Sequence, residues 1–230
     1  YPLIDGVVNG CPSVLLEPSR TNLVTYSEDF SNAYWTKSNA TVASNEIISP
    51  DGSLSADKLV EDTSTNQHWI YKLSIPVTIG NDYSISCFFK KGERNYAQLR
   101  LLTNINLNAV FNLDTGEIHS NASGVANIET FADGWYRCSV SGTATSTGSA
   151  EFYHNINPTG ISGENYIGDG TSGIYIYGTQ LEAGSYPTSY IKSNSGSATT
   201  RLADTANGAG DATTFNDSEG VLMAEISALS

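Results

Sequence analysis

Aromatic, amide and cationic side chains spaced two residues apart are the clearest candidates for chemistry in this sequence. Trp69 and Tyr71 alternate in one segment, and Tyr153 and Asn155 do so in another. Residues two apart on a strand share a face. An aromatic ring covers the C–H patch of a sugar, and planar amide or guanidinium groups bridge its hydroxyls. The pattern predicts a ligand-binding face built from Trp69, Tyr71, Phe88, Lys90, Gln98, Arg100, Tyr153 and Asn155. The alternative is that these good strand formers merely cover a sheet.

Motifs for catalysis are absent from the sequence. It contains no GxSxG elbow, no HExxH, no phosphate-binding loop and no dinucleotide fingerprint. His68, His119 and His154 show no spacing to Ser or Asp that suggests a triad. Glycoside hydrolysis needs only two carboxylates about 5 to 10 Å apart, so it stays open as an alternative. We predict that the chain is not an enzyme and needs no cofactor.

The charge balance argues against several classes of partner. Lys and Arg number 11 against 24 Asp and Glu, for a formal net charge of −13. This excess of negative charge argues against nucleic acid and against an anionic membrane surface. No run of 18 apolar residues exists, so no membrane-spanning helix is expected, and no signal peptide is visible. The chain starts at Tyr1 without an initiator Met, which suggests a piece of a longer protein.

Three cysteines cannot all pair within the chain. Cys87 and Cys138 lie in strand-like segments, and Cys11 lies near the start. We predict that Cys87 and Cys138 are free, buried thiols that pack as small apolar groups. A disulfide between adjacent strands is the alternative. The cysteine and histidine spacing fits no zinc site.

Alternating apolar and polar residues run through most of the chain. Such runs cover 83–90, 96–102, 134–140, 150–156 and 173–181, and 110–118 has the form of a hairpin. Turn signals recur every 8 to 15 residues. No segment keeps a helical period for three turns, so at most a short helix is expected at 28–34 or 55–59. The pattern predicts an all-β, antiparallel β-sandwich.

Changes in composition divide the chain into three parts. Residues 1–25 are expected to be an extended lead-in, and 26–192 the sandwich. Residues 193–230 begin with a Ser-, Gly- and Thr-rich linker and end in a strand that starts near Asp217. A lone strand cannot bury itself, so we interpret it as the first strand of a truncated second domain.

Several sequence segments resemble, in the same order along the chain, those of one protein family. Leu15–Lys37, Asp51–Leu59, Asp133–Arg137 and Ile176–Ile191 resemble a domain common in bacteriophage tail and fibre proteins. That domain is similar to jelly-roll carbohydrate-binding modules, and the segment from Thr200 resembles the entry to a concanavalin-like lectin domain. The resemblance implies a non-catalytic, glycan-binding jelly roll on a virion, with host-surface polysaccharide as partner. It supplies no ligand-residue motif.

The resemblance also implies a possible structural calcium ion near the first and last strands. Asp29, Asp51 and Glu182 could contribute oxygen ligands. This chain has Gly178-Thr179-Gln180 where such modules often carry an aspartate, which weakens the expectation.

Two alternative functions stay open at this point. One is a structural spacer or decoration domain whose aromatic face packs against another copy or another virion protein. The other is an accessory binding module of a secreted, extracellular polysaccharide-degrading enzyme.

Overall fold

The computed structural model describes residues 3–4, 7–8 and 16–205, and the chain divides into two compact units. One unit comprises Tyr1–Pro18 with Ala203–Ser230. Its described part contains β1 (Leu3–Ile4) paired antiparallel with β2 (Val7–Val8). Ser19–Leu202 form the other unit. Cys11 and the strand expected from Asp217 lie outside the described residues.

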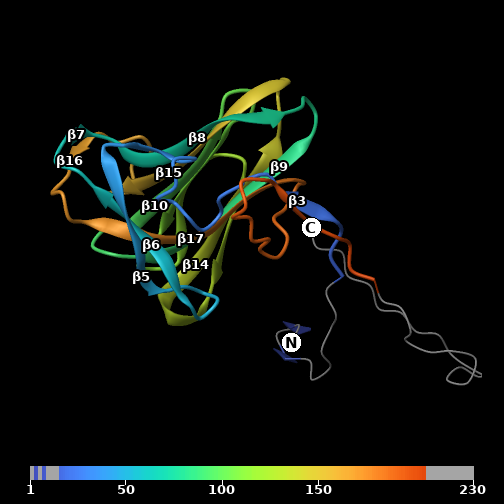
Figure 1. The fold of residues 1–230 in the computed structure, drawn as a ribbon, viewed down its shortest axis with the longest axis horizontal. Helices are drawn as coiled ribbons and strands as arrows, with labels where there is room; N and C mark the ends of the chain where they lie inside the picture. The colour runs from blue at the N-terminus through green and yellow to red at the C-terminus, as the bar shows by residue number, and fades with distance from the viewer. Residues whose placement is uncertain (1–2, 5–6, 9–15, 206–230) are drawn as a thin grey trace, which may run out of the picture. The chain divides into compact units, whose positions relative to one another are not determined.

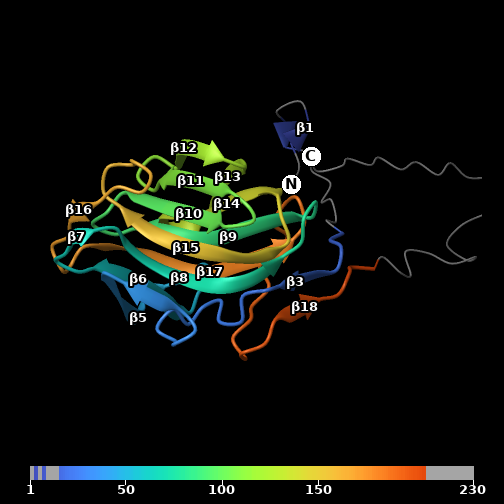
Figure 2. The ribbon, with the colours of Figure 1, turned by 90° about the horizontal axis from the view of Figure 1, so that it is seen from above.

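Two antiparallel six-stranded sheets pack together to form the larger unit. The first sheet has the order β12 (Glu117–Ser123), β11 (Leu107–Asn112), β10 (Tyr96–Leu102), β15 (Gly148–Asn157), β8 (His68–Val77) and β4 (Thr36–Ser38). The second has the order β13 (Val125–Thr130), β14 (Trp135–Thr143), β9 (Asp82–Lys91), β17 (Gly173–Ala183), β6 (Leu54–Glu61) and β5 (Ala40–Ile48). The chain crosses repeatedly between the sheets, as Figure 2 shows. The predicted all-β jelly-roll sandwich is confirmed.

The expected helices are not formed. Residues 55–59 lie within strand β6, and residues 28–34 form turns and bends. The one helical turn in the described part of the chain is a 3-10 turn, Ala132–Gly134. No described helix could therefore cross a membrane.

The core lies between the two sheets and follows from strand alternation. Ile85 and Phe89 from β9 face Leu99 from β10 and Phe152 from β15, and all four are fully buried. Burying each such side chain contributes about 1.5–3 kcal/mol. Trp35, just before β4, adds a further buried ring.

Cys87 and Cys138 lie opposite each other on β9 and β14. Both are free, buried thiols, so that prediction is confirmed. Burial raises the pKa of each thiol above its ordinary value.

Two short ribbons close the ends of the sandwich (Figure 1). At one end β7 (Thr65–Asn66) pairs with β16 (Tyr166–Ile167), and at the other β3 (Arg20–Asn22) pairs with β18 (Thr199–Arg201). The compact unit that contains both ribbons runs from Ser19 to Leu202. The β3–β18 pair cannot be predicted from residue alternation, because each of its strands has only three residues.

Asn22 fixes β3 to the sandwich through its buried side chain. Its Nδ2 donates to the carbonyl oxygens of Thr179 (3.2 Å) and Ile191 (2.9 Å). Its Oδ1 accepts from the backbone N–H groups of Val24 (3.1 Å) and Leu181 (3.2 Å). One side chain therefore satisfies four backbone groups from three segments.

Candidate functional site

Six of the predicted site residues share the outer face of the first sheet, on three adjacent strands. We call them the aromatic–amide face: Trp69 and Tyr71 on β8, Tyr153 and Asn155 on β15, and Gln98 and Arg100 on β10. They form two rows across the strands, one of Tyr71, Tyr153 and Arg100 and one of Trp69, Asn155 and Gln98. The intervening residues Ile70, His154 and Leu99 are buried in the core.

The three rings of this face contact one another and are partly exposed. Tyr71 and Tyr153 stack with 5.4 Å between ring centroids and 28° between ring planes. Trp69 lies 5.3 Å from Tyr153 at 53°. The Tyr153 hydroxyl donates to Glu151 at 2.7 Å. Such mutual contacts hold the rings in place, so they form a platform for a flat apolar ligand surface.

Gln98 lies beneath the 158–165 loop and is fully buried. Its Nε2 donates to Asn108 Oδ1 and to Ser162 Oγ, both at 2.7 Å. Its Oε1 accepts from the backbone N–H of Gly163 at 3.5 Å. Gln98 therefore positions the loop rather than presenting free donors. Asn108 and Ser162 were not among the predicted site residues: the spacing from Asn108 to Val110 indicates a strand, but no local sequence signal marks Ser162.

Three buried polar atoms of the aromatic–amide face have no hydrogen-bond partner in the described structure. They are Trp69 Nε1, Arg100 Nε and Asn155 Oδ1. Leaving a buried donor or acceptor unsatisfied costs about 1–3 kcal/mol each. Water or a ligand that reaches these atoms would satisfy them.

Phe88 and Lys90 do not join this face, because β9 belongs to the second sheet. Phe88 is 5% exposed and packs with Trp135 and Tyr177 on the outer side of that sheet. Lys90 lies in register with Trp135 and Tyr175. Their alternation along the strand was predicted correctly, but alternation cannot say which sheet a strand joins.

The proposed calcium ligands lie in separate hydrogen-bond networks. Asp29 accepts from Ser31 and Asn32, and Asp51 accepts from Ser49, Ser53 and Tyr177. Glu182 is buried and accepts from Thr188 and Gln180. Within residues 16–205 no three His, Cys, Asp or Glu side chains are grouped as metal ligands. Calcium stays a prediction.

An acidic cavity of about 350 Å³ lies beside β5 and β6. Its lining residues are Glu28, Asp29, Ser31, Ser44, Asn45, Ser55, Asp57 and Asn194. Asp57 is 3% exposed, and burial raises its pKa to about 6. Its two oxygens accept from the backbone N–H groups of Phe30 (3.1 Å) and Asn45 (3.0 Å). These bonds commit both oxygens of Asp57 to holding two segments of the chain together.

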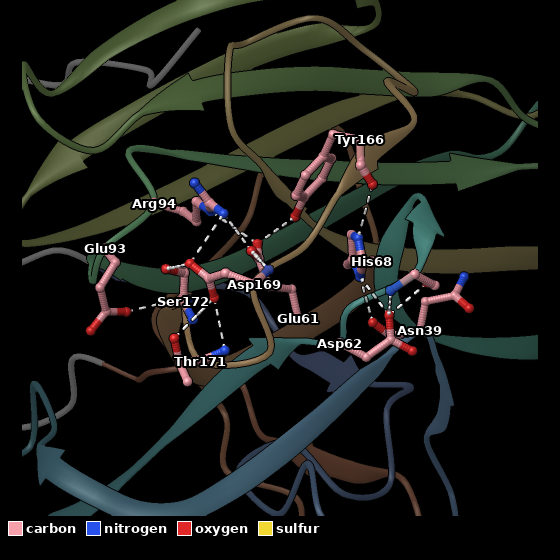
Figure 3. Close-up of polar contacts among 12 residues, drawn as sticks. Asn39, Glu61, Asp62, His68, Glu93, Arg94, Tyr166, Asp169, Thr171 and Ser172 are labelled. Carbon is pink, nitrogen blue, oxygen red and sulfur yellow. Dashed lines mark hydrogen bonds and ion pairs between the residues drawn. The ribbon is translucent and has the colours of Figure 1, made fainter.

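A second polar cluster surrounds Glu61 at the β7–β16 end (Figure 3). Glu61 is 1% exposed and accepts from Arg94 (Nε at 2.9 Å, and Nη2), the Tyr166 hydroxyl (2.8 Å) and the Asp169 N–H (2.9 Å). Burial alone would raise the pKa of Glu61, but these donors hold it below its ordinary value. Burial and the neighbouring Glu61 raise the pKa of Tyr166. The cluster therefore offers neither a carboxylic acid poised to donate a proton nor a phenolate poised to accept one.

Comparisons with known proteins give only distant structural likenesses. No family model matches the chain, and no curated protein matches its sequence. The enzymatically active domain of bacteriophage CBA120 tailspike protein 4 is similar at 15% identity and a TM-score of 0.42, over 70% of this chain and 21% of that one.

Two similar structures contain carbohydrate-binding modules. The CBM22-1–GH10 modules of Clostridium thermocellum xylanase 10B, complexed with xylohexaose, match at 13% identity and a TM-score of 0.43, over 76% of this chain and 30% of that one. The mannan-recognising module TmCBM27 matches at 11% identity and a TM-score of 0.34, over 74% and 98%. This chain thus spans less than a third of the first two. All three likenesses are too distant to indicate a ligand or an activity for this chain.

Proposed function

We propose that this chain is a non-catalytic carbohydrate-binding module and that the aromatic–amide face binds the glycan. The observation that carries the proposal is the combination, on one sheet face, of three contacting rings with unpartnered Trp69 Nε1, Arg100 Nε and Asn155 Oδ1. A sugar matches both requirements, because each pyranose ring has C–H patches and a rim of hydroxyls.

The residues of the face take different parts in this binding. Tyr71, Tyr153 and Trp69 contact the sugar rings, and Asn155 and Arg100 hydrogen-bond to sugar oxygens. Gln98 holds the 158–165 loop in place through Ser162. Since the rings are partly exposed on an open sheet, one site buries limited area and binds weakly.

We further propose that the glycan belongs to a bacterial surface and that the chain is displayed on a phage tail or fibre. The support is the resemblance of the ordered segments Leu15–Lys37, Asp51–Leu59, Asp133–Arg137 and Ile176–Ile191 to tail and fibre domains. Several copies on one particle would convert weak sites into tight attachment through avidity. A glycan found only in plant cell walls would instead favour the accessory module of a secreted enzyme.

The proposal is tested with the 230-residue chain on an array of bacterial and plant polysaccharides. Tyr71→Ala removes a ring from the platform, and Tyr175→Ala removes a partly exposed ring from the second sheet as the matched control. We expect Tyr71→Ala to weaken binding at least about tenfold, equivalent to ~1.4 kcal/mol, while Tyr175→Ala has little effect.

Two outcomes would overturn the proposal. One is the absence of binding to every polysaccharide, and the other is equal loss in both variants at unchanged melting temperature. If no glycan binds and the chain self-associates in a way that Tyr71→Ala disrupts, the spacer function is supported instead.

A further inference from the structure

Arg100 differs from Arg94 and Arg137 in having no hydrogen bond to any described protein group. Arg94 pairs with Glu61, and Arg137 donates to Ser86 and to the Thr188 carbonyl oxygen. Arg100 has no ion pair and no hydrogen bond to any described residue, and its Nε is buried. Its one contact of note is with the Tyr153 ring, whose centroid lies 5.7 Å from the guanidinium carbon.

The position of Arg100 explains why this lack of a partner is costly. It lies on the inner strand β10, between Tyr153 on one side and Asn108 on the other. The Arg100 side chain is partly buried, and the loss of hydration that this causes lowers the pKa of its guanidinium from the ordinary value. The nearest acidic residue along β15 is Glu151, which receives the Tyr153 hydroxyl and forms no ion pair with Arg100. A poorly hydrated charge without a counter-ion is destabilising unless a ligand supplies the opposite charge.

We infer that the glycan bound by the aromatic–amide face carries a carboxylate, as in a uronic acid, and that Arg100 binds this carboxylate. The inference rests on the proposed glycan-binding function and names the class of its ligand. A guanidinium is planar and presents paired donors that match the two oxygens of a carboxylate. The adjoining Tyr71–Tyr153 stack lies in the same row as Arg100, so one acidic sugar and its neighbour in the chain can contact both.

The charges elsewhere on the chain favour a glycan that carries only few, well-separated acidic groups. The face offers one unpaired cation, Arg100, while Lys37 donates to the Ser31 and Asn32 carbonyl oxygens. The formal net charge of −13 repels a densely charged polyanion. One carboxylate suits one guanidinium better than a phosphate or sulfate cluster, which recruits several cations. We therefore expect a neutral backbone with isolated uronates.

The test is an array on which each uronate-containing polysaccharide is present twice, once native and once after its carboxylates have been reduced to primary alcohols. The wild-type chain should bind the native form about 10- to 100-fold more tightly than the reduced form, the range expected for a charge-assisted hydrogen-bonded pair. Arg100→Gln should bring both forms to the same, weaker affinity. Arg100→Lys, which keeps the charge but loses the planar donors, should retain only part of the preference.

Lys90→Gln is the matched control, because it removes the same charge from the outer face of the second sheet. It should leave the preference unchanged. Arg100→Gln should not lower the melting temperature, because it removes an unpaired charge. The comparison of native with reduced polysaccharide uses the wild-type chain alone. It therefore tests the inference even if a variant misfolds.

The outcomes separate this inference from the proposed function. Equal binding of native and reduced polysaccharides would overturn the carboxylate assignment while leaving glycan binding intact. A preference for sulfated or phosphorylated glycans over uronates would overturn it as well. Binding to no polysaccharide at all would overturn both the inference and the proposed function.

Discussion

Replacing Arg94 with methionine should show how much the Glu61 cluster at one end of the sandwich contributes to the free energy of unfolding. Glu61 is 1% exposed at the end of β6, and Arg94 is the cation that pairs with it. Arg94→Met keeps most of the apolar stem of the side chain but removes both guanidinium hydrogen bonds. The Glu61 carboxylate is then left buried with only the Tyr166 hydroxyl and the Asp169 N–H as donors.

The size of the effect follows from the remaining contacts. Breaking a buried ion pair by removing one partner costs about 3–5 kcal/mol. Two of the four hydrogen bonds to Glu61 survive, so we expect the low end of that range, ~3 kcal/mol at pH 7. The deficit should shrink as the pH falls toward the ordinary carboxyl value of 4.5 and below it, because the buried, unpaired Glu61 of the variant takes up a proton more readily than the wild-type group and then needs no counter-ion. In the wild type the lowered pKa of Glu61 stabilises the fold above the ordinary value of 4.5, and this stabilisation is lost as the pH falls.

The assay is urea unfolding of wild type and variant at pH 7 and at about pH 4. Lys58→Met is the matched control, because Lys58 pairs with the half-exposed Glu93 (2.8 Å) and should cost at most about 1 kcal/mol. Glycan affinity of folded Arg94→Met should be unchanged if the aromatic–amide face is the site. A loss below about 1 kcal/mol at pH 7, or a loss that does not vary with pH, would refute the reasoning about a buried carboxylate that depends on Arg94.

Three further predictions concern the fold. Asp57 has a folded pKa of about 6 against an ordinary 3.8, so it contributes ~3 kcal/mol of stability that is fully present below about pH 4 and lost as the pH rises through 6. Asp57→Asn should therefore flatten that part of the stability–pH curve measured by urea unfolding, and parallel curves would contradict the assignment. In a Cys11→Ser chain, a thiol reagent should modify Cys87 and Cys138 only after unfolding, and rapid reaction of the native chain would show that they are not buried. Asn22→Ala should lower the free energy of unfolding by at least ~3 kcal/mol, because it leaves four backbone groups without partners; a loss under about 1 kcal/mol would mean that water replaces the amide.

Most of the fold prediction was based on the alternation of apolar and polar residues along the strands. The segments predicted at 83–90, 96–102 and 150–156 correspond to β9 (Asp82–Lys91), β10 (Tyr96–Leu102) and β15 (Gly148–Asn157). These strands are long, and the face toward the core is apolar, so period two is visible locally. The β3–β18 pair escaped prediction because it depends on one long-range polar side chain, Asn22, and not on a periodic pattern.

The candidate site was predictable where strands are neighbours and unpredictable where the pairing is decided at long range. Trp69 and Arg100 share a face because β15 pairs with both β8 and β10. Phe88 shows the same alternation, but β9 pairs with β14 and β17 in the other sheet. Ser162 lies in a loop that contacts Gln98 only in the folded chain, so its place at the site could not be predicted from the sequence.

The most direct test of the central claim is to observe the three tryptophan indole N–H groups by NMR while a glycan identified on the array is added. Trp35 Nε1 donates to the Tyr26 carbonyl oxygen (2.9 Å) and Trp135 Nε1 to that of Ile48 (3.1 Å), whereas Trp69 Nε1 has no partner among the described residues. If the aromatic–amide face binds the glycan, the Trp69 resonance alone should shift, and the shift should saturate. A Trp69 resonance that stays in place while the glycan binds would contradict the account.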